Sequence, residues 1–319
     1  MPIVVNTNSS ATTASYNLSR ANDSLRTSLA RLSSGNKINS PADDAGGLAV
    51  AYKLNSKLNR TSAVIQNAQN GLSYLQVQDS SLQTAGKIVD RMSELRTMAQ
   101  DITKNTGDIE NYSKEFIELQ SQLNQVSKEK FNGISLFANS SATVAGTLET
   151  GTASFSSVAY TTFHRTLITH ESGVSTSGSI QLNVINFQFM LSIGTLSSGA
   201  AAGTAIDLGN VNGSNSGTGT NAGFVSDITE VNISQFTNII ERIADMRAEN
   251  GAEQNRVLNS IDLLQSNMTN LEAAHGRIMD TDIALESTRF ARHNVLVQAS
   301  AAMTAQANQL TNVALQLLG

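Results

Sequence analysis

The chain has 319 residues, of which 40% are hydrophobic, 15% charged and only 5% aromatic, and its net charge is −5. This length allows one large core or two domains, and the scarcity of aromatic side chains favours packed helices over a β-sandwich. The acidic balance argues against non-specific binding to nucleic acid or to a membrane surface, and the absence of cysteine excludes disulfides, cysteine-ligated zinc and thiol nucleophiles. No apolar run approaches the roughly 18 residues of a membrane-inserted helix, and because the first positive side chain is Arg20 we expect no cleaved secretory signal.

The first predicted helix carries a narrow apolar seam near the N-terminus. This seam is formed by Leu18, Leu25, Leu29 and Leu32. It stops at the segment SSGNKINSPADD (33–44), where Gly35 and Pro41 break a helix. We expect the carboxylate of Asp43 to cap the helix that follows, because it precedes the free N–H groups of a new first turn.

Three further stretches have apolar residues every three or four positions: residues 68–102, 109–126 and 257–278. That period keeps one apolar seam facing a partner helix, and it predicts helices of roughly 20–60 residues. A 60-residue helix is about 90 Å long. The predicted fold class is therefore mainly α, a rod of long coiled-coil or bundle helices formed by the N- and C-terminal segments.

The middle of the chain, residues 141–229, has a different composition. It is rich in glycine, serine and threonine and poor in charge, and the stretch SIQLNVINFQFMLSIG (179–194) favours strands. The stretch GSNSGTGTNAG (213–223) is typical of a flexible loop. We expect a small strand-rich, loop-rich region here, with a β-hairpin and at most one small β module.

The last predicted helix repeats apolar residues at intervals of seven. These are Leu296, Met303, Leu310 and Leu317, with Ala299 and Val313 beside them. The simplest arrangement pairs this helix with the first one. Two helices alone share a thin core, because ordering each residue costs about 1–2 kcal/mol and each buried Leu or Met returns only about 1.5–3 kcal/mol. We therefore expect other copies of the same chain to cover the remaining apolar surface.

The residue patterns of enzymes and metal sites are weak or missing. HESGV (170–174) begins like a zinc-protease helix but has Val174 where the second histidine must stand. The carboxylate pairs Asp43–Asp44 and Asp280–Asp282 lie beside helix breaks, where capping is the simpler role than acid–base catalysis. We predict no catalytic residue, no metal site and no cofactor.

Several motifs, in order along the chain, resemble those of bacterial flagellins. On the N-terminal side they are SLARLSSGNKINSPADDAGGLAVA (28–51), QNAQNGLSYLQVQDSSL (66–82) and KFNGISLF (130–137). On the C-terminal side they are GAEQNR (251–256), RIMDTDIALES (277–287) and VQASAAMTAQANQLTNVALQLLG (297–319). The resemblance covers about 1–140 and 230–319.

The resemblance implies a secreted structural subunit that self-assembles into the flagellar filament, the helical propeller for swimming. Residues 1–42 and 279–319 would form the terminal coiled coil of the inner filament core. Residues 43–140 and 230–278 would form the surrounding helical tube, and 141–229 would project outward. The family also implies export in the unfolded state by the flagellar type III route.

Partners follow from the same resemblance. They are other copies of the chain, an export chaperone on the C-terminal helix at about 295–318, and the filament cap and hook-junction proteins. The segment DRMSELRTMAQ (90–100) resembles the patch that Toll-like receptor 5 recognises. Arg91, Glu94 and Leu95 keep that pattern, whereas Asp90, Met92 and Ser93 depart from it.

Three alternatives stay open at this point. A hook–filament junction protein shares the terminal motifs but would form a short ring. A flagellin with a protease insert would need the zinc motif that HESGV lacks. A free-standing binding module would be a stable monomer with ordered ends.

Overall fold

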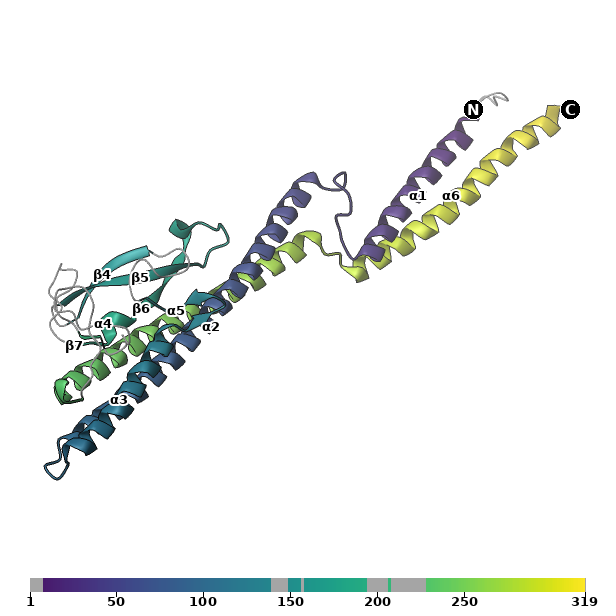
Figure 1. Cartoon of the computed structure of the whole chain (residues 1–319). Coiled ribbons are helices and arrows are strands. Elements are labelled where there is room, and N and C mark those ends of the chain that lie inside the picture. The colour runs from purple at the N-terminus through teal and green to yellow at the C-terminus, as the bar shows by residue number, and fades with distance from the viewer. Residues whose placement is uncertain (1–7, 139–148, 156–157, 194–205, 208–227, 319) are drawn as a thin grey trace. The chain divides into compact units, whose positions relative to one another are not determined.

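The computed structural model of the chain describes residues 8–138, 149–155, 158–193, 206–207 and 228–318 (Figure 1). Long helices dominate it. They are α1 (Ser9–Ser34), α2 (Ala45–Ala99), α3 (Thr106–Ser127), α5 (Ile233–Met279) and α6 (Ile283–Leu318), with the single turn α4 (Phe187–Met190). The chain divides into two compact units, residues 1–59 with 267–319, and residues 60–266. The prediction of a mainly α fold with a small strand-containing middle is confirmed.

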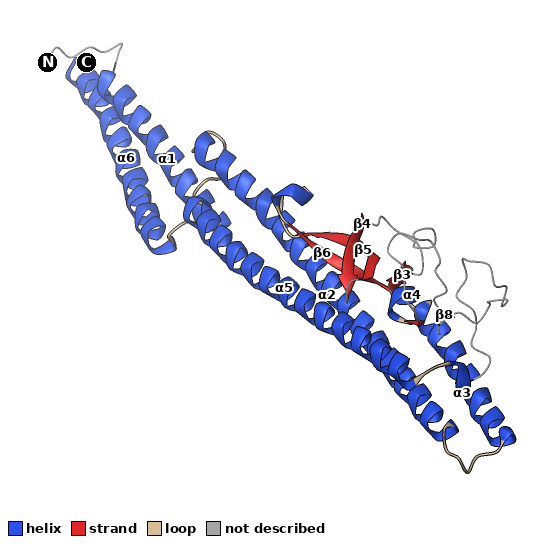
Figure 2. Cartoon of the chain, turned by 90° about the vertical axis from the view of Figure 1, so that its left-hand side faces the viewer, coloured by secondary structure: helices blue, strands red, loops and turns tan. Residues whose placement is uncertain are grey.

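The terminal unit pairs the two ends of the chain. Helices α1 and α6 lie side by side and antiparallel, with both termini at the same end of the pair (Figures 1 and 2). Gly35, in the left-handed conformation at φ 72°, ends α1 as predicted, and its N–H bonds to the Arg31 carbonyl at 2.9 Å. The segment after α1 is linked to the segment that joins α5 and α6. Asn36 and Asp280 form a single antiparallel β-bridge, and the Thr281 N–H donates to the Gly35 carbonyl.

The cap of α2 differs from the prediction. Asp44, not Asp43, receives the free N–H of the first turn, at 2.8 Å from the Gly47 nitrogen to Oδ1. Asp43 instead accepts from the N–H groups of Asn39 and Ser40, and these backbone bonds lower the pKa of its carboxyl. The two adjacent carboxylates therefore stabilise two consecutive turns, one before the helix and one at its start.

The second unit is a three-helix core of α2, α3 and α5. Its largest fully buried side chains include Leu75, Leu82 and Met92 of α2, Phe116 of α3 and Phe236 of α5. The rings of Phe116 and Phe236 meet edge to face at 6.2 Å. The apolar periodicity seen in the sequence is thus the contact surface of these helices.

A four-stranded sheet lies beside α2 and α5 in the order β3-β6-β5-β4 (Figure 2). The strands are β3 (Phe137–Ala138), β4 (Glu149–Phe155), β5 (Val158–Ile168) and β6 (Ser179–Asn186). Two-stranded ribbons join β1 (Lys130–Phe131) to β2 (Ile134–Ser135) and β7 (Ser192–Ile193) to β8 (Ile206–Asp207). Only the β3–β6 pair is parallel in the four-stranded sheet.

Gly71 lets the sheet approach α2 closely. A Cβ atom at this position would lie 3.0 Å from Cδ2 of Leu167 and 3.5 Å from Cδ1 of Leu182. Leu167 comes from β5 and Leu182 from β6, so both central strands rest on the same turn of α2. The absent side chain is what permits this packing.

One strand prediction was wrong in part. Residues 179–194 form β6, then α4, then β7, and not one strand. The Asn186 side chain accepts a hydrogen bond from the Phe189 N–H at 3.1 Å, which starts a helical turn and buries Phe187 and Met190. The predicted loop 213–223 lies outside the described residues.

Candidate functional site

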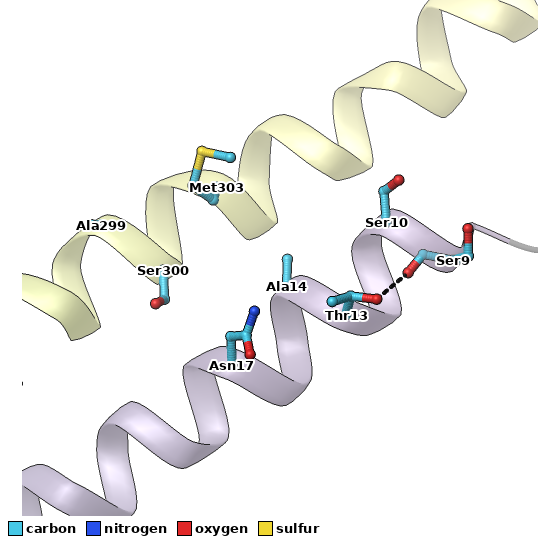
Figure 3. Close-up of a pocket in the computed structure, with 8 residues that line it drawn as sticks. All are labelled: Ser9, Ser10, Thr13, Ala14, Asn17, Ala299, Ser300 and Met303. Atoms are coloured by element: carbon cyan, nitrogen blue, oxygen red, sulfur yellow. Dashed lines mark hydrogen bonds between the residues drawn. The ribbon is translucent and has the colours of Figure 1, made fainter. Parts of the chain in front are cut away.

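The interface between α1 and α6 is poor in buried apolar side chains. Within the described parts of these two helices, Ala307 is the one buried apolar residue, and the buried polar ones are Ser28 and Glu286. Leu18, Leu25 and Leu32 of the predicted seam lie half-buried on the α6 side of α1. On α6 the half-buried side chains are Phe290, His293, Val297, Ser300 and Thr304. Small and polar residues therefore make up much of this contact, and several of them line the groove between the two helices that Figure 3 shows.

Other apolar residues of α6 lie exposed on a face beside the contact with α1. Leu285 is 52% exposed, Leu296 46% and Met303 64%. With Ala299 they repeat every three to four residues after Leu296, so they lie on one face, which we call the α6 stripe (Leu285, Leu296, Ala299 and Met303). The residue after Leu296, Val297, belongs to the face toward α1, so the two faces are adjacent.

The sequence prediction paired the seven-residue repeat of α6 with the seam of α1, and the structure leaves the two members of that repeat that it describes exposed. Leu296 and Met303 are exposed, and so is Leu29 of α1, at 54%. The helix α6 continues through Leu310, Val313 and Leu317, whose side chains lie outside the described part of the structure. The face that α6 turns toward α1 has a steric explanation. Ser300, Thr304 and Ala307 allow a closer approach of the two helices than leucine and methionine would.

Polar contacts at each end set the register of α1 on α6. Asn8 caps α1 through the Ala11 N–H, and its Nδ2 donates to the Ala307 carbonyl at 2.8 Å. Toward the other end, Glu286 is 3% exposed and forms an ion pair with Arg289 at 3.2 Å. Burial raises the pKa of Glu286, but the neighbouring Ser28 hydroxyl and the Arg289 and Arg31 cations outweigh burial and lower it.

Sequence reasoning did not single out Asn8 or Glu286. The signal for Asn8 was present, because an asparagine directly before a serine-rich helix start is a typical N-cap. Glu286 could be found only by noting that it occupies an inward position, four residues before Phe290. A carboxylate there looks like an ordinary first-turn residue until its burial is known.

Of the residues that resemble the receptor patch, two are on the surface. Arg91 pairs with Glu94 and with Glu115, each at 2.9 Å, and these hydrogen bonds raise the pKa of Arg91. Leu95 is fully buried against the other helices of its unit. The surface here consists of the Arg91 and Glu94 side chains together with Glu115 of α3.

The described residues hold no group of three or more His, Asp or Glu side chains placed to bind a metal ion. The HESGV segment is a turn after β5, where the His170 ring contacts Ser172 and Glu171. Within the same described set, no helix is both long and apolar enough to cross a membrane.

The long helices that pair the two ends of the chain, with a small strand-containing middle, place the protein in the class of mainly helical proteins. Two family models match it, the bacterial flagellin N-terminal helical region over residues 5–142 and the bacterial flagellin C-terminal helical region over residues 233–318. The chain belongs to the bacterial flagellin family and is a subunit of the flagellar filament.

Relatives match over nearly the whole chain. A flagellar filament 33 kDa core protein of Treponema phagedenis is 31% identical over 99% of this chain and 100% of its own length. A flagellin of Bacillus subtilis is 30% identical, over 98% of this chain and 99% of its own. The crystal structure of a Bacillus cereus flagellin is 21% identical with a TM-score of 0.41, and the match covers 66% of this chain and 94% of that one.

Proposed function

We propose that copies of this flagellin join through the α6 stripe and its continuation at Leu310, Val313 and Leu317. The observation that carries this proposal is the exposure of Leu296 and Met303 beside an α1–α6 interface built largely of small and polar residues. Burying a leucine or methionine contributes about 1.5–3 kcal/mol. An apolar face left uncovered within one copy is therefore a strong driving force for association between copies.

In this proposal the terminal segments 1–42 and 279–319 form the inner coiled coil of the filament. Residues 43–140 and 230–278 form the tube around it, and 141–229 faces outward. The half-buried leucines Leu18, Leu25 and Leu32 hold α1 to α6 within a copy, and Leu29 faces a neighbouring copy. Its 54% exposure supports that assignment.

The exposed apolar face of α6 also gives a reason to expect an export chaperone. Val295, at 64% exposure, extends the apolar surface of the last helix beyond the α6 stripe. A chain that displays this surface in the cell would aggregate, so an export chaperone covers about 295–318 until the unfolded chain enters the type III route. After secretion, the filament cap and hook-junction proteins meet the same terminal helices at the two ends of the polymer.

Contact with Toll-like receptor 5 is a further part of the proposal. It would rest on the exposed ion-paired side chains Arg91 and Glu94 together with Glu115. Leu95 would act from inside the helix core, as a residue that positions this segment of α2. Its complete burial supports that indirect role.

The test of the assembly surface is the double variant Leu296→Ser/Met303→Ser. We expect the monomer to keep its helical circular dichroism and to lose salt-induced polymerisation, measured by sedimentation and electron microscopy. The control is Ala291→Ser/Ala302→Ser, which puts two hydroxyl groups on the exposed side of α6 that faces away from α1 and leaves polymerisation intact. Normal filaments from the stripe variant would show that copies join through another surface.

A further inference from the structure

One edge of strand β6 is bonded to helix side chains at Asn183. Strand β3 pairs with β6 at Ile185 and Asn186. Two residues before that pairing begins, the Asn183 N–H donates to both carboxylate oxygens of Glu253, and the Asn183 carbonyl accepts from Gln78 Nε2 at 3.0 Å. The side chains of Gln78 and Glu253 therefore take the place of a neighbouring strand at this point of the sheet.

The two helix side chains belong to a buried hydrogen-bond network between α2 and α5. Gln78 of α2 also donates to the Leu136 carbonyl at 2.9 Å, and its Oε1 accepts from Nδ2 of Asn250 on α5 at 2.6 Å. Leu136 directly precedes β3, so the network holds both β3 and β6. Its four members are buried, and we call them the β6 junction: Gln78, Asn183, Asn250 and Glu253.

Glu253 is the titratable member of the β6 junction. In the described part of the chain, the Asn183 N–H is the one hydrogen-bond donor to its two oxygens. A carboxylate has about four acceptor sites, so one shared N–H compensates poorly for the water that burial removes. Burial accordingly raises the pKa of Glu253 to about 7, although the Asn183 N–H acts in the opposite direction.

Other titratable and charged groups lie around the junction on three elements. They are Glu249 and Arg256 on α5, Tyr74 on α2, and Arg165 and His164 on β5. Glu249 raises the pKa of Glu253 and Arg256 lowers it, and both effects are smaller than that of burial. Burial also raises the pKa of the Tyr74 hydroxyl, which hydrogen-bonds to Arg165. Burial therefore decides the protonation of Glu253.

We propose that the β6 junction is a pH-sensitive latch, which holds β6, and through it the four-stranded sheet, against α2 and α5. While Glu253 is protonated, the junction carries no charge and stays closed. When Glu253 ionises as the pH rises through neutrality, a buried carboxylate is left with one N–H partner, and opening of the junction brings water to it. The sheet then separates from the helices more often. This inference does not depend on how copies of the chain join.

The helical core does not need the junction in order to stay folded. Its largest buried side chains are apolar and come from the helices themselves, such as Met92, Phe116 and Phe236. Phe116 and Phe236 meet edge to face, which joins α3 to α5 without any strand. These contacts persist when β6 separates, so the opening of the latch is local.

Amide hydrogen exchange of the full-length monomer measures this opening. We expect the opening constant of the Asn183 amide, corrected for the intrinsic exchange rate, to rise at least tenfold between pH 5 and pH 8, because the open state releases the Glu253 proton at lower pH. Low concentrations of urea should leave this exchange unchanged, because a local opening exposes little surface. The amide of Leu123, which is fully buried on α3, should depend on urea, because its exchange requires unfolding of the core.

A variant pair assigns the pH dependence to Glu253. Glu253→Gln keeps an oxygen for the Asn183 N–H and cannot ionise, so we expect its opening constant at Asn183 to change less than twofold between pH 5 and pH 8. The control is Glu249→Gln, the same substitution at an exposed position one turn earlier on α5. We expect it to keep the tenfold rise of the natural chain.

Three results would each overturn the latch. The first is an opening constant at Asn183 that does not change with pH in the natural chain. The second is a rise with pH that persists in Glu253→Gln. The third is exchange at Asn183 that depends on urea as strongly as exchange at Leu123, which would mean that the sheet separates only when the core unfolds. Polymerisation does not enter these measurements, so such results would leave the proposed assembly surface standing.

Discussion

At the scale of single residues, Glu253 is the unusual side chain of the second unit. It is 8% exposed, and both of its carboxylate oxygens accept the Asn183 N–H, at 3.1 and 3.0 Å. Beside it, the Gln78 side chain donates to the carbonyls of Leu136 and Asn183 and accepts from Asn250. These bonds attach strand β6 to helices α2 and α5, so the sheet is held by a buried polar junction as well as by apolar contacts.

Burial raises the pKa of Glu253 from an ordinary 4.5 to about 7, against the partial opposing effect of the Asn183 N–H. The folded chain therefore keeps a proton that the unfolded chain releases between these two pH values. The free energy of unfolding due to this group is largest below pH 4.5, falls as the pH rises through about 7, and is then constant.

Glu253→Gln removes that pH dependence. We expect the variant to be more stable than the natural chain at pH 8 by about 1–3 kcal/mol, because each pKa unit corresponds to about 1.4 kcal/mol. The difference should shrink toward zero at pH 4.5. Urea unfolding of the monomer at a series of pH values measures it, and a difference that does not change with pH would contradict the burial argument.

At the scale of elements, capping decides where helices begin. Asn105 starts α3 with a capping box, in which its Oδ1 accepts the Asp108 N–H at 2.8 Å and Asp108 accepts the Asn105 N–H at 3.2 Å. The same principle explains the wrong strand prediction at 187–190. Alternation of apolar residues predicted a strand, but Asn186 supplied a cap, and the burial of Phe187 and Met190 stabilised the turn.

Asn105→Ala is expected to lower the free energy of unfolding of the second unit by about 1 kcal/mol, the usual cost of a lost cap. The same substitution inside α3, Asn111→Ala, is the control. Asn111 is exposed, and alanine has the higher helix propensity, so this variant should be neutral or slightly more stable. Thermal unfolding followed at 222 nm compares the two variants, and equal effects would show that the capping box contributes nothing.

At the scale of the whole molecule, the two units have different sources of stability. Among the residues whose burial the structure describes, 60–266 contain nearly all of the fully buried apolar side chains. The described part of the terminal unit has few, and in our proposal this unit gains further apolar burial from neighbouring copies in the filament. A marginally stable end that becomes ordered on assembly is consistent with export in an unfolded state.

Removal of residues 300–319 should therefore abolish polymerisation and leave the second unit folded. The deletion takes away Met303 of the stripe and the Thr304 and Ala307 positions that contact α1. We expect sedimentation to find no polymer, and urea unfolding to give the same midpoint for the core helices as in the full chain. Filaments of ordinary length from the shortened chain would refute the role of the last helix.

The sequence by itself determined the helical flanks, the break at Gly35 and the strand-containing middle. Each of these follows from local chemistry, namely apolar periodicity, a left-handed glycine, and the lack of charge in residues 141–229. The resemblance of the terminal motifs added the family. These features can be predicted without knowing which residues pack against a given side chain.

Only the tertiary structure decided which faces are covered. Periodicity places Leu296 and Met303 on one side of α6, but it cannot say that Val297, Ser300 and Thr304 will be the side turned to α1. Periodicity placed Leu95 on the apolar seam of residues 68–102, and the structure buries it, but the pattern gave no sign that Glu253 is buried as well. Whether a helix face is buried depends on the sizes and polar groups of residues far away in the sequence. Those residues come into contact with the helix only when the chain folds.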